Sequence, residues 1–171
     1  MAIGSNLASK HAMKNYYFSL LFFTCCFFTF SQENEKQPVF PIVKTDKEWK
    51  EQLNGMEYYV LRRSGTEYAF SSALNDEKRK GIYRCAGCDA PLFRSENKYD
   101  SGSGWPSFDR PLSEKAIFYA VDYEIGVART EERCANCGSH LGHVFEDGPR
   151  ATTGLRHCIN GVALKFVPDE K

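Results

Sequence analysis

Cys158 is the residue whose type and spacing best suit it to act as a nucleophile. Six of the seven cysteines fall into close pairs, at 25 and 26, 85 and 88, and 134 and 137, and Cys158 stands alone. A cysteine reacts as its thiolate, and a nearby cation lowers the thiol pKa. On a strand, Arg156 and Cys158 share a face while His157 points the other way, so the pattern predicts a permanent positive charge beside the sulfur. The alternative is an inert core cysteine.

Four of the paired cysteines have the spacing of a structural zinc site. Cys85-Ala86-Gly87-Cys88 and Cys134-Ala135-Asn136-Cys137 are two knuckles that can present paired thiolates to one tetrahedral Zn²⁺. The pairs lie more than forty residues apart, so we expect the one zinc ion to tie two remote hairpins together. Four thiolates leave no open position for catalysis. Two disulfides or a redox-active pair remain alternatives.

Two histidines and a tryptophan can complete a site around Cys158. His140 and His143 follow directly on the second knuckle, and an imidazole there can hydrogen-bond a substrate oxygen or move a proton near neutral pH. Trp105 lies in a stretch of glycine and serine and is followed by Pro106. Such a loop can present an aromatic face to an apolar ligand, although a tryptophan buried in a core corner is the simpler interpretation of the loop alone.

A series of motifs resembles the methionine sulfoxide reductases of the B class, from about Thr45 to Pro168. The motifs are Cys85/Cys88, Gly104-Trp105-Pro106-Ser107-Phe108, Arg129-Thr130-Glu131, His140-Leu141-Gly142-His143-Val144-Phe145, Asp147-Gly148-Pro149, Thr153-Gly154-Leu155-Arg156 and Cys158-Ile159-Asn160. The resemblance implies a mainly β fold with two antiparallel sheets in a sandwich or barrel-like core, short N-terminal helices and a structural zinc. It also implies reduction of the R epimer of methionine sulfoxide, in proteins or as the free amino acid.

The resemblance also assigns roles to particular residues. Cys158 matches the nucleophile, and the residues matching its polar surroundings are His140, His143, Arg156 and Asn160. Trp105 matches the aromatic wall for the substrate methyl group, and we expect Phe145 of the same motifs to bind substrate. Protonation of the sulfoxide oxygen would make the substrate sulfur electrophilic, and attack by Cys158 would release methionine and leave a sulfenic acid.

Three positions depart from the family pattern. Many members carry a resolving cysteine at the position of Ser103, and serine cannot form a disulfide. We therefore expect a one-cysteine cycle in which an external thiol, such as a thioredoxin-like protein, reduces the sulfenic acid. His157 stands where Tyr or Phe is usual, and Gly161 where Ser is usual.

The elements that position these residues follow from local patterns. Thr45 and Glu48 fit a capping box for a helix from Asp46 to about Leu53, with Trp49 and Leu53 on one face. A second helix is predicted from about Gly55 to Arg63, with Met56 and Tyr59 at helical spacing, and the aromatic residues of both helices are expected in the core. Beyond Gly81 the pattern predicts antiparallel strands at 82–84, 116–122, 127–130, 143–145, 158–162 and 164–167.

The N-terminal part of the chain has the pattern of a secretory signal. A basic flank precedes an apolar run over 16–30, and Thr29 and Ser31 are small residues at the spacing of a cut after Ser31. We therefore predict a signal peptide at 1–31, with 1–12 as a possible extension before Met13, a linker at 32–41 and the reductase domain at 42–171. Removal of the signal would export the protein to a periplasm or the exterior. The alternatives are a membrane anchor over 16–30, a buried helix, or a lipoprotein cut before Cys25.

Composition argues against several other functions. Basic and acidic residues balance at 22 each, so no overall field favours nucleic acid or an anionic membrane. The knuckles lack the basic stripe and interleaved aromatics that single-stranded nucleic acid needs. The sequence of 171 residues, 42% hydrophobic, suffices for one domain, and we expect a monomer. The remaining alternative to an enzyme is a zinc-stapled module that binds oxidised or apolar peptides without turning them over.

Overall fold

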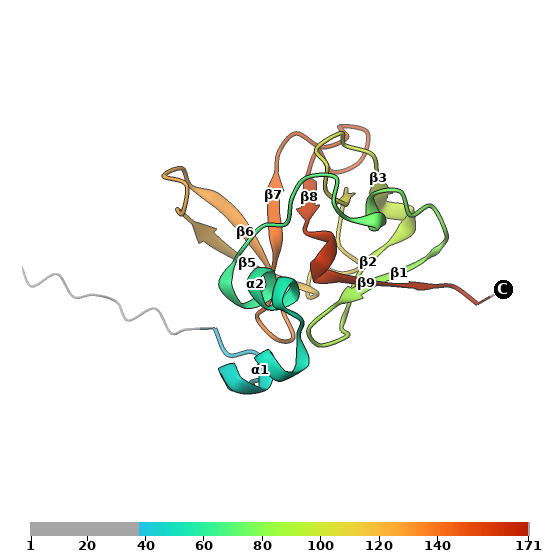
Figure 1. Cartoon of the computed structure of the whole chain (residues 1–171). Coiled ribbons are helices and arrows are strands. Elements are labelled where there is room, and N and C mark those ends of the chain that lie inside the picture. The colour runs from blue at the N-terminus through green and yellow to red at the C-terminus, as the bar shows by residue number, and fades with distance from the viewer. Residues whose placement is uncertain (1–37, 171) are drawn as a thin grey trace, which may run out of the picture. The chain divides into compact units, whose positions relative to one another are not determined.

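The computed structural model describes residues 38–170, and within them the chain forms two antiparallel sheets with two short helices (Figure 1). The predicted signal peptide lies outside the described residues. The smaller sheet has the strand order β2-β1-β9, and the larger has the order β3-β4-β8-β7-β6-β5. The strands are β1 Gly81–Cys85, β2 Pro91–Arg94, β3 Lys98–Tyr99, β4 Ser107–Phe108, β5 Ile117–Asp122, β6 Arg129–Cys134, β7 His140–Phe145, β8 Arg156–Ile159 and β9 Leu164–Pro168. The predicted mainly β architecture is confirmed.

Both helices begin with a capping box, of which the one at Thr45 was predicted and the one at Asn54 was not. Helix α1, Asp46–Gln52, carries the capping box of Thr45 and Glu48. Helix α2, Gly55–Arg63, carries a second capping box formed by Asn54 and Glu57. These side chains satisfy backbone donors that an α-helix leaves free at its start. Helix α2 ends where Ser64 adopts a left-handed conformation, with φ 51°.

The expectation that the aromatic residues of both helices are buried was half wrong. Trp49 is buried at 2% exposure, with the guanidinium of Arg62 4.7 Å from its ring centre. Tyr59, however, is 50% exposed, because α2 turns Val60 and Leu61 into the core instead. The helical spacing of Tyr59 was right, but the buried face of α2 is the one that carries Val60 and Leu61.

The strand predictions locate most of the sheet and miss its short members. Strands β2, β3 and β4 were not predicted, and two of them have only two residues each. The predicted strand 158–162 is displaced: β8 begins at Arg156 and ends at Ile159, and a 3-10 turn, Gly161–Ala163, follows. Two-residue strands carry no alternation to detect, since their pairing is set by neighbouring strands.

One face of the larger sheet gathers the polar residues. Paired residues of neighbouring antiparallel strands project to the same face. His143 pairs with Glu131 on β6 and with Cys158 on β8, and Cys158 pairs with Ser107 on β4. The opposite face carries His157 and Phe108, both almost fully buried. Cys158 and His143 therefore lie side by side on adjacent strands, as β7 and β8 do in Figure 1.

A β-bulge brings His140 to the same face as His143. The register shifts between Glu132 and Arg133, so that Glu132 pairs with Gly142 while Arg133 pairs with His140. Leu141 is thus an extra residue in β7, and its side chain is buried in the core. Without the bulge, strict alternation would place His140 and His143 on opposite faces.

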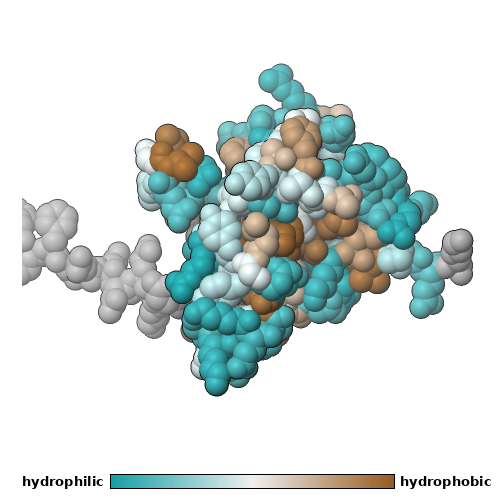
Figure 2. Space-filling model, viewed as in Figure 1, coloured by the Kyte–Doolittle hydropathy of each residue, from teal (hydrophilic) through white to brown (hydrophobic). Residues whose placement is uncertain are grey.

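The β5–β6 hairpin carries exposed apolar residues. Val121, Tyr123, Ile125 and Val127 are each 64–68% exposed, and apolar surface covers the turn of this hairpin in Figure 2. Within residues 38–170, no helix is both long and apolar enough to cross a membrane. The apolar run over 16–30 is not among these residues.

Candidate active site

Cys158 opens into a cavity of about 130 Å³ that is lined by both aromatic and polar residues. Trp105 and Phe145 supply the aromatic part of the lining, and His143, Asn160 and Arg129 supply the polar part. Thr66 and Gly142 complete it. Of the residues predicted for the site, the structure brings together Cys158, His143, Asn160, Trp105 and Phe145. His140 and Arg156 stand just outside this cavity.

Gly142 allows the two central strands of the site to approach. A Cβ at this position would lie 2.0 Å from the backbone oxygen of Cys158, which is far inside van der Waals contact. Only glycine therefore lets β7 run this close to β8. This close approach sets His143 directly beside Cys158 in the register.

Burial and polar neighbours act on the Cys158 thiol in opposite directions. Burial raises the pKa of Cys158 above its ordinary value of 9.0, while the hydroxyl of Ser103 and the charge of Arg156 lower it. Ser103 Oγ lies 3.8 Å from Cys158 Sγ. The predicted effect of Arg156 has the right sign, but burial outweighs it, so the resting residue is a thiol rather than a preformed thiolate.

Arg156 does not act as a free cation. Its guanidinium binds both carboxylate oxygens of Asp147, at 2.8 and 2.9 Å, and stacks over Phe145 at 4.5 Å. This ion pair raises the pKa of Arg156 and shares its charge with an exposed carboxylate. The guanidinium thus helps to hold Phe145 in the cavity wall while exerting a reduced field on the sulfur.

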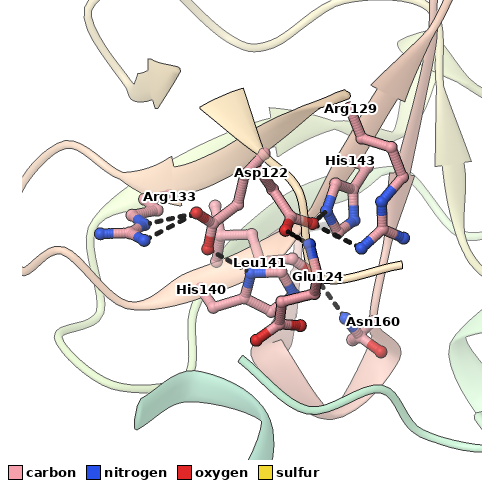
Figure 3. Close-up of polar contacts among 9 residues, drawn as sticks. Asp122, Glu124, Arg129, Arg133, His140, Leu141, His143 and Asn160 are labelled. Atoms are coloured by element: carbon pink, nitrogen blue, oxygen red, sulfur yellow. Dashed lines mark hydrogen bonds and ion pairs between the residues drawn. The ribbon is translucent and has the colours of Figure 1, made fainter. Parts of the chain in front are cut away.

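A carboxylate orients each histidine (Figure 3). His143 Nε2 lies 2.7 Å from Asp122 Oδ2, and hydrogen bonds from Glu124, His143 and Arg129 lower the pKa of Asp122 to about 2. An ionised Asp122 can only accept, so Nε2 of His143 carries a proton and Nδ1 is free to exchange one. Burial lowers the pKa of His143 below 6.5, although Asp122 opposes the shift.

His140 occupies a position behind His143. The two ring centres are 5.4 Å apart, and His140 Nδ1 lies 2.7 Å from Glu131 Oε1. Burial by itself would raise the pKa of Glu131, but its hydrogen bonds with His140 and Arg133 lower the pKa to about 2. His140 Nε2 has no partner among residues 38–170, and the ring lines a separate cavity under the β5–β6 hairpin.

Glu67 is a site residue that sequence reasoning missed. Its backbone N–H donates to Asn160 Oδ1 at 3.0 Å, and its carbonyl accepts from Trp105 Nε1 at 3.2 Å. Its carboxylate accepts from the backbone N–H groups of Gly161 and Val162. Glu67 thus positions both Trp105 and Asn160, yet it lies in a loop whose sequence gives no periodic signal. Arg129 and Glu131 were visible in a family motif but without a role.

Two of the three departures from the family pattern, His157 and Gly161, fit their surroundings. His157 Nδ1 lies 2.6 Å from Glu132 Oε1, and both side chains are buried on the core face. Phe at position 157 would leave that carboxylate without this partner, at a cost of about 1–3 kcal/mol or more. A Cβ at Gly161 would lie 2.0 Å from Ser72 Oγ, so Ser72 requires glycine there.

The four cysteines of the knuckles come together as predicted. Cys85, Cys88, Cys134 and Cys137 place their sulfur atoms within 4.8 Å of one another. The first pair begins at the last residue of β1 and the second at the last residue of β6, so the cluster joins the β1–β2 hairpin of one sheet to the β6–β7 hairpin of the other. The Sγ atoms of Cys85 and Cys137 are 3.8 Å apart and those of Cys88 and Cys134 3.5 Å, so these pairs are not disulfides, and all four thiols are free.

The donor set fits a tetrahedral Zn²⁺. Four sulfurs at the usual Zn–S distance would be about 3.8 Å apart, which the two measured pairs approach. Both helices secure the knuckles, because Gln52 Nε2 donates to the Gly87 carbonyl at 2.6 Å and Arg62 to the Cys137 carbonyl at 3.2 Å. The arrangement offers a closed structural site.

Comparison with known proteins is consistent with this geometry. The SelR domain family matches residues 53–168. The chain is 50% identical over 132 residues to "Peptide methionine sulfoxide reductase MsrB" of Leifsonia xyli subsp. xyli, covering 77% of this chain and 95% of that protein. Proteins of the same name from Agrobacterium fabrum and Leptospira interrogans are 51% identical over 125 residues and 50% over 127. They cover 73% and 74% of this chain, and 92% and 96% of their own lengths.

Proposed function

We propose, from the premise that this chain belongs to the methionine sulfoxide reductase B family, that it reduces the R epimer of methionine sulfoxide by direct attack of Cys158. The enzyme class itself follows from the family: the chain is a peptide methionine sulfoxide reductase. The observation that carries the mechanism is the cavity in which Cys158 faces both an aromatic and a polar wall.

The cavity matches the three different groups on a sulfoxide sulfur. The methyl group packs against Trp105 and Phe145, where burial of apolar surface is favourable. The oxygen turns to the polar side, where Asn160 and His143 lie. The attacking sulfur of Cys158 fixes a third direction around the substrate sulfur. In the other epimer, either the methyl group or the oxygen would then lie in the wrong part of the cavity, so the site selects one epimer.

The resting site already holds the proton that the first step needs. Cys158 is a thiol and His143 is neutral at pH 7, because burial shifts the two pKa values apart. Transfer of the thiol proton through His143 to the sulfoxide oxygen yields a thiolate and an activated substrate together. The sulfur is then reduced to a thioether, methionine leaves, and Cys158 becomes a sulfenic acid. Asp122 stabilises the imidazolium that forms on the way.

Among residues 38–170, the only cysteines besides Cys158 are the four of the knuckles. Ser103, 3.8 Å from Cys158 Sγ, has no sulfur to contribute, and the knuckle thiols belong to the other cluster. We therefore propose a one-cysteine cycle with a thioredoxin-like protein as reductant. We also propose that the four knuckle cysteines bind one Zn²⁺, which would cross-link the two sheets through coordination bonds and would have no open coordination position.

A single-turnover experiment tests the mechanism. Without reductant, enzyme mixed with methionine-R-sulfoxide should release about one methionine per chain, and a dimedone adduct should appear on Cys158 in mass spectra. The S epimer should give neither product. A disulfide between Cys158 and another cysteine of the chain would contradict the one-cysteine cycle, and equal turnover of both epimers would contradict the selectivity.

The cellular role rests on the N-terminal segment. We propose that residues 1–31 direct export and are removed, so that the enzyme repairs oxidised proteins outside the cytosol during oxidative stress. Mass measurement of the mature protein tests this proposal: a chain beginning at Gln32 supports it. A chain that keeps residues 16–30 and sediments with membranes supports an anchor instead.

A further inference from the structure

Cys158 lies close to two cavities, and the substrate occupies only one of them. The second, of about 460 Å³, is lined by residues of three segments: 99–103, 147–149 and 156. Ser103 and Arg156, the two polar neighbours of the Cys158 thiol, both line this second cavity and not the first. The sulfur therefore has one side on the substrate cavity and another side behind Ser103.

The chemistry of recycling makes this arrangement useful. A thiol attacks a sulfenic acid along the line of the S–O bond, from the side opposite the leaving oxygen, as in other displacements at sulfur. Because the substrate occupies the first cavity, the oxygen acquired by Cys158 points there. The attacking sulfur must then approach from outside the first cavity, and Ser103, which lines the second cavity and not the first, has its Oγ 3.8 Å from Sγ.

We propose that the second cavity is the entry site for the thiol reductant. The proposal rests on the proposed one-cysteine cycle. The incoming thiol forms an S–S bond with Cys158, and the S–O bond breaks. The thiol proton and the hydroxide leave as water through the first cavity. A second thiol then attacks the sulfur of the reductant, which releases Cys158 as a thiol and one disulfide of the reductant.

The charge of the second cavity indicates which thiols it favours. Its lining holds two carboxylates, Asp100 and Asp147, against one guanidinium, Arg156. Because Asp147 is already paired with Arg156, the carboxylate of Asp100 remains as the excess negative charge. The cavity should therefore admit cationic thiols faster than anionic ones of equal reactivity.

The test separates the two half-reactions with a variant that fills the second cavity alone. Pro149 lines that cavity, so Pro149→Trp should leave the first burst of methionine unchanged and slow loss of the sulfenic acid about tenfold or more. Three probes are used: cysteamine, 2-mercaptoethanesulfonate and a thioredoxin. Pro168→Trp is the matched control, since Pro168 is exposed at the end of β9 in the other sheet.

A second, more conservative variant tests the proposal even if Pro149→Trp does not fold. Asp100 Oδ1 accepts from the Gly102 N–H at 3.0 Å, and Asp100→Asn keeps that oxygen while removing the charge. The ratio of recycling rates with cysteamine and with 2-mercaptoethanesulfonate, each corrected for thiolate content, should fall about threefold. Unchanged recycling of folded Pro149→Trp with any of the three probes, or an unchanged ratio in Asp100→Asn, would overturn the proposal. Absence of the burst in the unmodified enzyme would instead overturn the proposed function.

Discussion

The four-cysteine cluster and Cys158 use the same side chain for opposite purposes. In the cluster each sulfur has three others within 4.8 Å, and Cys85 and Cys134 have no exposed surface. Cys158 is half-buried, has Ser103 and Arg156 as polar neighbours, and lines a cavity. From this contrast we expect that access to a cavity and the number of sulfur neighbours determine whether a thiol stabilises the fold or reacts.

The two regions are nevertheless built on shared strands. β6 carries Glu131 toward the site and ends at Cys134, and β7 begins at His140, three residues after Cys137. The cluster therefore lies beside the ends of the strands that carry Glu131, on β6, and the two site histidines, on β7. A substitution at Cys158 should therefore leave the cluster intact. A substitution in the cluster should instead alter the site by displacing β6 and β7.

Replacement of the nucleophile should give the largest effect. Cys158→Ser should lower methionine-R-sulfoxide reduction by at least about 10³-fold, because a serine hydroxyl does not ionise near neutral pH and is a far weaker nucleophile. Metal analysis should still find one zinc per chain, and the melting temperature should change little. Substantial activity in this variant would remove Cys158 from the mechanism.

The reciprocal change should affect the fold first. Cys134→Ser should lose the zinc and, if the cluster contributes about 4 kcal/mol, lower the melting temperature by about 12 °C. Activity at low temperature should fall less than in Cys158→Ser, because the reacting thiol remains. Zinc content, thermal unfolding and single-turnover rate should be measured on the same samples. Loss of activity in a variant that remains folded would mean that the cluster takes part in catalysis.

The pH profile of the single-turnover rate should depend on the pKa values of His143 and Cys158. Burial lowers the pKa of His143 from 6.5 and raises that of Cys158 from 9.0, so between these values the pair holds the one proton that the oxygen needs. The single-turnover rate should fall about tenfold per pH unit below the pKa of His143 and above that of Cys158. Asp122→Asn removes an interaction that raises the pKa of His143, so its acid limb should move to lower pH. A single-turnover rate that changes tenfold or more between pH 6.5 and pH 9.0 would contradict this assignment.

Local patterns predicted the parts of the fold that local interactions determine. The capping box at Thr45 and the paired knuckles are complete within a few residues, so their structures were evident in the sequence. The bulge at Leu141, the two-residue strand β4 and the contacts of Glu67 depend on partners far away along the chain. The site residues were found through motif types, but their arrangement required the sheet register.

The sequence pattern overstated the effect of the Arg156 charge on the Cys158 thiol. Replacing Arg156 should therefore give the smallest change in rate. Shared faces correctly placed its charge near Cys158, but the sequence did not show that Asp147 binds the same guanidinium. Arg156→Met, which keeps much of the packing on Phe145, should therefore lower the single-turnover rate at pH 7 only about threefold, since partly exposed ion pairs contribute little.

Asp147→Asn provides the opposite change at the same pair. Removing the carboxylate leaves the charge of Arg156 uncompensated, so the pKa of Cys158 should fall, whereas in Arg156→Met it should rise. The pH dependence of iodoacetamide alkylation at Cys158 measures both shifts on one scale. Shifts in the same direction would mean that Arg156 acts on the sulfur through packing, and the contrast with the cluster would then rest on access alone.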